Sequence, residues 1–250
     1  MQGYNEGFAY VYAMRWTFFA RDVAPRIRDF YERKGNHEKT VLDLACGTGE
    51  LATYLLDHDY EVIGLDLSPA MLIHAREKAR AYVREGKARF LEGDAADYVL
   101  DQQVGLVVST FDALNHLADM EALTGCFAST FNALTTGGWF IFDLNTRLGL
   151  NRWSSIDVQE DDDLVLITRG VVMHEEGRAY TQISGFLQQE DGLYNRFSEV
   201  VYNTIFDLAD VEAALRDEGF RHVHFAQGEA LDKPVMEPES YGRIFVIAQK

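Results

Sequence analysis

A glycine-rich turn near the start of the chain carries residue types that could hold a nucleoside-containing cofactor. Residues 41–52 read VLDLACGTGELA, an apolar strand that runs through small residues into a helix. The small residues Ala45, Gly47 and Gly49 let the backbone turn sharply and let a ligand approach without meeting a Cβ. Asp66 follows 19 residues after Gly47, where a doubly wound fold presents an acidic group to ribose hydroxyls. The spacing therefore predicts a cofactor that contains a nucleoside.

The glycine turn alone does not decide which cofactor is bound. Gly47-x-Gly49-x-x-Ala52 also satisfies the Gly-x-Gly-x-x-Gly/Ala pattern of dinucleotide-binding proteins. A nicotinamide-dependent oxidoreductase is therefore one alternative, although no hydride-transfer constellation is recognisable. A non-catalytic scaffold that binds a nucleoside cofactor is another alternative, because a fold does not by itself give a function.

A second group of polar residues follows the fourth predicted strand, at the edge where doubly wound sheets bind ligands. His116 is the candidate catalytic base there, because imidazole titrates near neutrality. A helix-capping or solvated histidine is the alternative interpretation of this residue. Side chains that could bind or orient an acceptor are Asp112, Asn115 and Asn145, with Asp143 as a further candidate.

No metal site is expected. A complete set of ligands is not recognisable at the strand ends, and His222 and His224 are two ligands without a third. Their spacing places both on one face of a predicted strand. We therefore interpret these two histidines as structural.

Five apolar strands alternate with helical segments in residues 39–145. The predicted strands are Thr40–Ala45, Glu61–Asp66, Ala88–Leu91, Val104–Ser109 and Trp139–Leu144. The predicted helices are Glu50–Asp57, Pro69–Arg84 and Ala118–Leu134. Unbroken apolar strands indicate burial on both faces, as in parallel sheets covered by helices. With two further strands near the end, Arg221–Ala226 and Arg243–Ala248, the pattern predicts an α/β fold: a doubly wound, seven-stranded, mostly parallel sheet with helices on both faces.

The other segments differ in character from this core. Residues 1–38, with apolar residues at helical spacing, predict an N-terminal helical cap. Residues 146–206 contain three β-rich runs separated by acidic-glycine turns, which predict an inserted antiparallel β-meander. This meander could form a lid over the substrate, or its edges could pair across a homodimer. A core made of residues 39–145 and 207–250 would surround it in the sequence.

Four segments in order resemble the motifs of class I S-adenosylmethionine-dependent methyltransferases, which have a Rossmann-like fold. These are Asp43–Gly49 (DLACGTG), Gly64–Leu72 (GLDLSPAML), Glu92–Ala95 (EGDA) and Thr136–Asp143 (TGGWFIFD). The layout is most similar to small-molecule members with an inserted β-meander, including amino-sugar and glycine N-methyltransferase-like proteins. The resemblance implies S-adenosylmethionine as cofactor, S-adenosylhomocysteine as product, and methyl transfer to nitrogen or oxygen by in-line displacement.

The resemblance also implies a role for each residue of the glycine turn. Asp43 would organise the methionyl amino group, and Gly47 and Gly49 would let the cofactor lie against the loop backbone. Ala45 stands where many members have glycine, a small change. Asp66 would bind the ribose hydroxyls.

The remaining implied contacts come from later motifs and from the N-terminal helix. They are Leu67 and Met71 against the adenine face, Asp94 and Ala95 beside its amino group, and Thr110 and Phe111 on the methionyl side. Tyr12 and Trp16 resemble an aromatic segment that folds over the donor in small-molecule members. Core packing of this aromatic stripe is the alternative interpretation.

The overall charge and composition limit the partners. A formal net charge of −17 opposes nucleic-acid binding and favours a small-molecule acceptor, with a slight preference for an amine. Two widely spaced cysteines indicate reduced thiols and a cytoplasmic protein. No apolar run approaches the length of a membrane span, and the first residues do not resemble a signal peptide.

Overall fold

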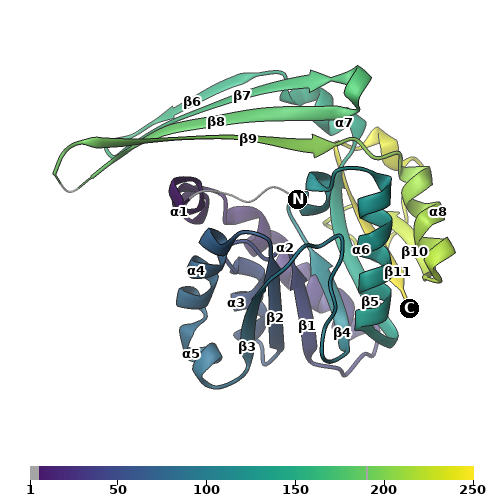
Figure 1. The fold of residues 1–250 in the computed structure, drawn as a ribbon. Coiled ribbons are helices and arrows are strands. Elements are labelled where there is room, and N and C mark those ends of the chain that lie inside the picture. Colours follow the sequence, from purple (N-terminus) through teal and green to yellow (C-terminus); the bar gives the residue numbers. More distant parts are fainter. Residues whose placement is uncertain (1–5, 190) are drawn as a thin grey trace.

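The computed structural model describes residues 6–189 and 191–250. Residues 1–5 of the predicted helical cap and Glu190 of a predicted turn lie outside the described residues. The described chain forms two separate sheets, one of seven strands and one of four (Figure 1). The predicted α/β fold with an inserted antiparallel meander is therefore confirmed.

The seven-stranded sheet has the order β10-β11-β5-β4-β1-β2-β3. Its strands are β1 (Thr40–Leu44), β2 (Glu61–Asp66), β3 (Ala88–Glu92), β4 (Val104–Ser109), β5 (Leu134–Asn145), β10 (Arg221–Ala226) and β11 (Arg243–Gln249). The first five are parallel, and β11 runs antiparallel to both of its neighbours. This arrangement places the carboxyl ends of β1, β2 and β4 at one edge of the sheet, where a ligand site is expected.

Helices cover both faces of this sheet. The helices are α2 (Phe18–Arg33), α3 (Glu50–Leu56), α4 (Pro69–Lys78), α5 (Arg80–Arg84), α6 (Met120–Ala133) and α8 (Leu208–Glu218). One core cluster joins α2, α3 and α4 to the sheet, and the other joins α6 and α8 to it. No helix in the described part of the chain is long and apolar enough to cross a membrane.

The segment predicted as a helical cap contains two helices in the described residues. Helix α1 (Glu6–Arg15) ends just before Thr17, the N-cap residue of α2. The break has a tertiary cause: α1 contacts α4 and the inserted sheet, whereas α2 packs beside α3. The predicted helix Pro69–Arg84 is likewise divided at Ala79 into α4 and α5.

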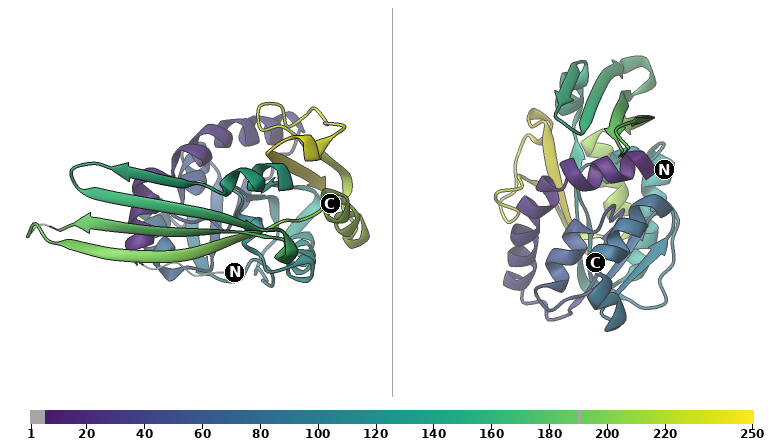
Figure 2. Two further views of the ribbon diagram at one scale, coloured as in Figure 1. Left: turned by 90° about the horizontal axis from the view of Figure 1, so that it is seen from above. Right: turned by 90° about the vertical axis from the view of Figure 1, so that its left-hand side faces the viewer.

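The four-stranded sheet lies over the carboxyl edge of the central sheet (Figures 1 and 2). Its antiparallel strands are β6 (Ile156–Glu160), β7 (Leu164–Met173), β8 (Arg178–Gln188) and β9 (Tyr194–Thr204). The sequence predicted the last three and missed β6, in which every residue is exposed. A linker of α7 (Arg147–Leu150) and a 3₁₀ turn, η2 (Asn151–Trp153), connects β5 to this sheet.

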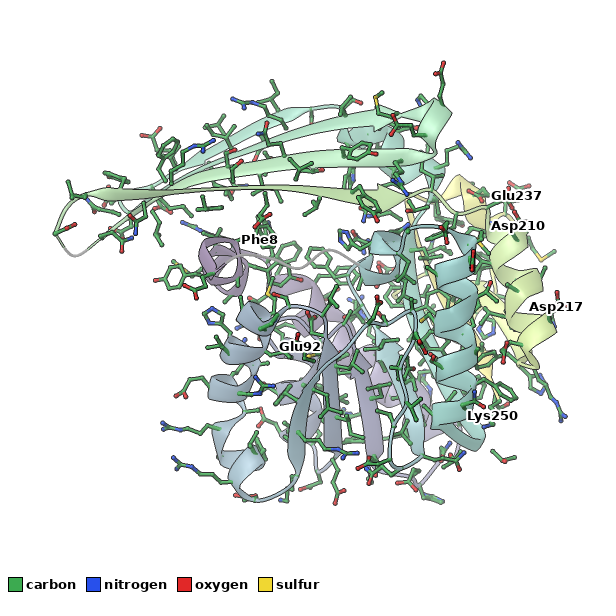
Figure 3. The ribbon with its side chains drawn as sticks, in the orientation of Figure 1. Phe8, Glu92, Asp210, Asp217, Glu237 and Lys250 are labelled. Atoms are coloured by element: carbon green, nitrogen blue, oxygen red, sulfur yellow. The ribbon has the colours of Figure 1, made fainter. Side chains whose placement is uncertain are left out.

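Helix α1 fills the space between the two sheets. Phe8 and Val11 of α1 form a buried cluster with Met71 of α4 and with Leu164 and Val201 of the inserted sheet. Figure 3 shows Phe8 directly beneath that sheet. An ion pair between Arg15 and Asp161 also joins α1 to the turn between β6 and β7. Helix α1 and the four-stranded sheet together enclose the site described next.

Candidate active site

A cavity of about 350 Å³ is lined by residues at the carboxyl ends of β1, β2 and β4, by α1 and by the four-stranded sheet. Its walls come from parts of the chain that are far apart in sequence. The residues that line it include Tyr12, Trp16, Ala45, Gly47, Asp66, Met71, Thr110, Phe111, Asp112, His116, Arg152, Trp153, Ser155, Thr168, Gly170, Thr181, Ile183 and Arg243.

The glycine turn and Asp66 form one end of this cavity. The Asp66 carboxylate accepts a hydrogen bond from Gly47 N at 2.7 Å and from Ser68 N at 2.8 Å, which fixes its orientation beside the loop. Burial raises the pKa of Asp66, and the two backbone donors oppose that rise. Ala45, Gly47 and Gly49 have φ values of +57°, +53° and +78°, so the turn uses left-handed backbone at three points. This explains why the turn favours small residues.

Asp43 lies beneath the same turn and does not line the cavity. It is 2% exposed, and its carboxylate accepts a hydrogen bond from Ala52 N at 3.1 Å. Burial raises its pKa to about 7, against the effect of that backbone donor. A cation bound nearby would favour the ionised form of this carboxyl group.

The remaining residues predicted to contact the cofactor divide into two groups. Tyr12, Trp16, Met71, Thr110 and Phe111 line the cavity. Gly49, Leu67, Asp94 and Ala95 do not line it. Gly49 is the N-cap residue of α3, Asp94 accepts a hydrogen bond from Ala96 N, and Ala95 is buried in the core.

The cavity fits the nucleoside cofactor that the turn predicts. Asp66 supplies a fixed carboxylate for hydroxyl groups, and a Cβ on Gly47 would stand 3.8 Å from the Tyr12 ring, in the space that a ligand would use. Tyr12 and Trp16 pack edge to face with ring centroids 5.8 Å apart, and Met71 is buried beside this wall. Aromatic faces of this kind attract cations.

His116 lines the other end of the cavity. Its Nδ1 lies 2.7 Å from the carbonyl oxygen of Tyr202 in β9, which can only accept a hydrogen bond. In the neutral ring Nδ1 therefore carries the hydrogen and Nε2 carries the lone pair. Burial lowers the pKa of His116 below its ordinary value, although the carboxylate of Asp112 acts against this shift. The predicted base thus belongs to the cavity as a neutral imidazole.

Arg243 is a cavity residue that the sequence analysis missed. Its guanidinium contacts Asp112 at 2.5 Å and also pairs with Asp143. Asp143 accepts backbone hydrogen bonds from Phe111 at 2.7 Å and Asp112 at 3.0 Å, both of which have positive φ. Burial raises the pKa of Asp143 and Arg243 lowers it. The arginine and Asp143 therefore hold the strained loop that carries Phe111.

No local motif could have indicated this cluster, because Arg243 lies 131 residues from Asp112 and 100 residues from Asp143. The guanidinium also stacks over Phe19, with 4.6 Å between its central carbon and the ring centroid. The same carbon lies 5.4 Å from the centroid of the Phe111 ring, so two carboxylates and two aromatic rings surround Arg243.

Asn115 and Asn145, predicted as acceptor contacts, do not line the cavity. Asn115 is fully buried, and its amide group bonds to the backbone of Asn145 and Thr204. These bonds join the loop after β4 to β5 and β9. We therefore leave both asparagines out of the acceptor contacts proposed below.

Within residues 6–189 and 191–250, no group of three His, Cys, Asp or Glu residues could hold a metal ion. His224 bonds to the carbonyl oxygen of Leu231, and His222 lies at an irregular point of β10 with a φ of +50°. The regular alternation expected for these two histidines is therefore interrupted.

Known proteins match both the sequence and the fold. A family model described as a methyltransferase domain matches residues 41–138. The Bacillus subtilis protein YqeM, named among the methyltransferases, is 29% identical over 84% of this chain and 83% of its own length. The dTDP-3-amino-3,4,6-trideoxy-alpha-D-glucopyranose N,N-dimethyltransferase of Streptomyces venezuelae is 29% identical over 90% of this chain and 94% of its own length.

The fold matches a crystal structure of an S-adenosylmethionine-dependent methyltransferase from Clostridium acetobutylicum, with a TM-score of 0.83, 23% identity and 97% of each chain covered. Together with the family match, these similarities decide the cofactor class that the glycine pattern left open. The chain is similar to methyltransferases over most of its length, with a methyltransferase domain at residues 41–138, and is an enzyme with S-adenosylmethionine as its cofactor.

Proposed function

We propose that the enzyme transfers a methyl group to a nitrogen or oxygen atom of a small-molecule acceptor, with an amine as the preferred class. The observation that carries the proposal is the shared cavity. Asp66 and the glycine turn lie at one end, His116 at the other, and the four-stranded sheet covers both. One relative is named as an amino-sugar N,N-dimethyltransferase, which agrees with an amine acceptor.

The cofactor end of the cavity holds its ligand through few, fixed groups. Asp66 would bind the ribose hydroxyls, the backbone at Gly47 would let the ligand lie close, and Asp43 would supply negative charge for the methionyl ammonium. Tyr12, Trp16 and Met71 provide the apolar wall. S-adenosylmethionine, when bound, supplies a methyl group that is already activated by the sulfonium.

His116 removes the proton that the acceptor must lose. An ammonium group has no lone pair to attack with, so the nucleophile must first be neutral. The contact from Nδ1 to the Tyr202 carbonyl leaves the Nε2 lone pair as the base, and burial keeps the ring neutral at physiological pH.

The inserted segment 146–206 is the acceptor-binding unit in this proposal. Thr168 of β7, together with Thr181 and Ile183 of β8, lines the cavity, so that acceptor shape is selected by this sheet. The sheet and α1 also exclude water, which helps to hold the nucleophile in line with the transferred methyl group.

Two matched variants separate the cofactor end from the acceptor end. In calorimetric titrations Asp66→Ala should lose the binding of S-adenosylmethionine and S-adenosylhomocysteine, while His116→Gln should bind both as the wild type does. With an amine or phenol acceptor found by screening for S-adenosylhomocysteine release, His116→Gln should lower the rate about 10²- to 10⁴-fold.

The wild-type rate should stay high down to a pH below the ordinary range of histidine and then fall, because protonation removes the base. A His116→Gln variant that keeps the full rate, with an unchanged pH profile, would exclude His116 as the base. A protein that binds the cofactor but methylates only a macromolecule would refute the small-molecule acceptor.

A further inference from the structure

We propose that the acceptor carries an anionic group, a phosphoryl or carboxylate, and that Arg152 binds it. This inference rests on the proposed function and assigns a second contact point to the acceptor, separate from the atom that is methylated. It is carried by the placement of the linker between the two sheets and by the charges that line the cavity.

The linker is fixed against both sheets by close backbone contacts. A Cβ on Gly149 would overlap the carbonyl oxygen of Gly242, next to Arg243, and Thr146 N donates to the same oxygen at 3.1 Å. At the other end of the linker, a Cβ on Gly170 of β7 would overlap the carbonyl oxygen of Trp153. Gly170 N also donates to Ser155 O at 2.9 Å.

Because both ends are held in this way, the backbone of Arg152 and Trp153 is anchored on the acceptor side of the cavity. A group that lines a cavity from a fixed backbone loses less conformational freedom on binding than one from a mobile loop. The linker is therefore suited to present a recognition group rather than only to connect two sheets.

Arg152 is a cation on the cavity wall without a carboxylate partner in the described part of the chain. Among the described residues it has no ion pair, whereas Arg243 is paired with Asp112 and Asp143. Asp66 is oriented by the glycine turn at the cofactor end. Arg152 is therefore a positive charge on the cavity wall that has no carboxylate partner among the described residues, although the whole chain has a net charge of −17.

The side chains that line the cavity with Arg152 suit an oxyanion. Ser155, Thr168 and Thr181 carry hydroxyl donors, and Trp153 adds an aromatic surface. Asp157 of β6 pairs in register with Thr168 of β7. Its carboxylate accepts a hydrogen bond from the Gln159 side chain and does not line the cavity. A guanidinium with nearby hydroxyls is a typical partner for phosphate or carboxylate oxygens.

An amine and an anion on one acceptor reconcile the local charge with the proposed chemistry. The amine end would lie near His116, and the anionic end would anchor at Arg152. The net charge of the protein favours a cationic acceptor, and this preference then applies only to the amine end of the acceptor, which reacts.

The test measures binding of three matched sugars to the protein loaded with S-adenosylhomocysteine. The probes are glucosamine, its 6-phosphate and its uronic acid, titrated by calorimetry into wild type, Arg152→Gln and Arg169→Gln. Arg169 is the matched control, because it is an exposed arginine on the neighbouring strand β7, outside the cavity lining. Melting temperatures of the three proteins verify that each is folded.

We expect the wild type to bind at least one anionic sugar about tenfold more tightly than glucosamine. Arg152→Gln should remove that preference and Arg169→Gln should keep it. The preferred anion then identifies a phosphoryl or a carboxylate acceptor. Equal affinities in the wild type, no binding of any sugar, or a preference that survives Arg152→Gln would overturn the inference.

Methylation in the same samples distinguishes this result from a failure of the proposed function. Neutral acceptors that are methylated without any anion preference would refute the Arg152 site and leave the function intact. An anion preference that depends on Arg152, combined with no methylation of any small molecule, would refute the function and leave the binding site.

Discussion

Asp43 is the residue whose burial is hardest to account for by stability alone. It is a carboxyl group with one backbone donor, and burial raises its pKa to about 7. The unfolded chain has the ordinary value of 3.8, so between these two values the folded state binds a proton that the unfolded state has lost. The free energy of unfolding therefore falls as pH rises through this window, and the loss is complete above pH 7.

Asp43→Asn should remove this pH-dependent loss. At pH 8 we expect the variant to be more stable than the wild type by about 1 to 4 kcal/mol, since each pKa unit corresponds to about 1.4 kcal/mol. The asparagine oxygen can still accept from Ala52 N, but the negative charge for the methionyl ammonium is gone, so cofactor affinity should drop. Urea unfolding at pH 5 and pH 8, with cofactor titration, measures both effects. Parallel pH dependence in the two proteins would contradict this account.

The residues of the glycine turn could be predicted because they follow one another in the chain. Gly47 follows the end of β1, and Asp66 is the last residue of β2. Only α3 and β2 lie between them in the sequence, so these two elements set their spacing. Arg243 could not be predicted, because its partners come together only when β11 pairs with β5. The partners of Asn115 could not be predicted for a related reason: it is next to His116 in the sequence, but its amide donates to the backbone of β5 and β9.

At the scale of elements, the strands of the central sheet could be predicted from their apolar runs, whereas only three of the four strands of the inserted sheet could be predicted. Strand β2 was predicted with both of its ends, because the charged residues Glu61 and Asp66 stand on either side of its apolar run. The five exposed residues of β6 gave no burial pattern to recognise. The break between α1 and α2 was also missed, because it reflects packing on two different partners and no proline or glycine marks it.

The contact between the linker and β7 is an element-scale feature that a single methyl group can disturb. Gly170→Ala should displace Trp153 and break the bond from residue 170 to Ser155 O. We expect faster amide hydrogen exchange in the η2 turn and at position 170, with an unchanged cofactor affinity, because the glycine turn lies at the other end of the cavity.

Val171→Ala is the control, since Val171 is the next residue on β7 and is 49% exposed. It should leave exchange in the linker as in the wild type. Equal exchange in Gly170→Ala and wild type would show that the linker does not depend on this contact.

For the whole molecule, charge is the dominant property. A net charge of −17 produces self-repulsion in the folded state, which salt screens over a Debye length of about 10 Å at 0.1 M. Salt also weakens surface ion pairs such as Arg33–Asp232, but exposed pairs of this kind contribute only about 0 to 1 kcal/mol each. The repulsion should therefore decide the sign of the salt effect.

We accordingly expect the melting temperature to rise as sodium chloride increases from about 10 mM to about 200 mM, where most long-range repulsion is screened. Differential scanning calorimetry without cofactor measures this, and potassium chloride should give the same curve because the effect is not ion-specific. A melting temperature that falls over this range would mean that ion pairs outweigh the net charge.

The ties between Arg243 and the loop after β4 also set the order in which the enzyme becomes complete during synthesis. The glycine turn and Asp66 leave the ribosome early, and the loop at Phe111 and Asp112 follows. Its guanidinium partner is made 131 residues after Asp112, on the last strand of the sheet. A nascent chain can thus form the glycine turn long before the loop at Phe111 and Asp112 is held in place, and we expect methyl transfer only after β11 has been translated and has paired with β5.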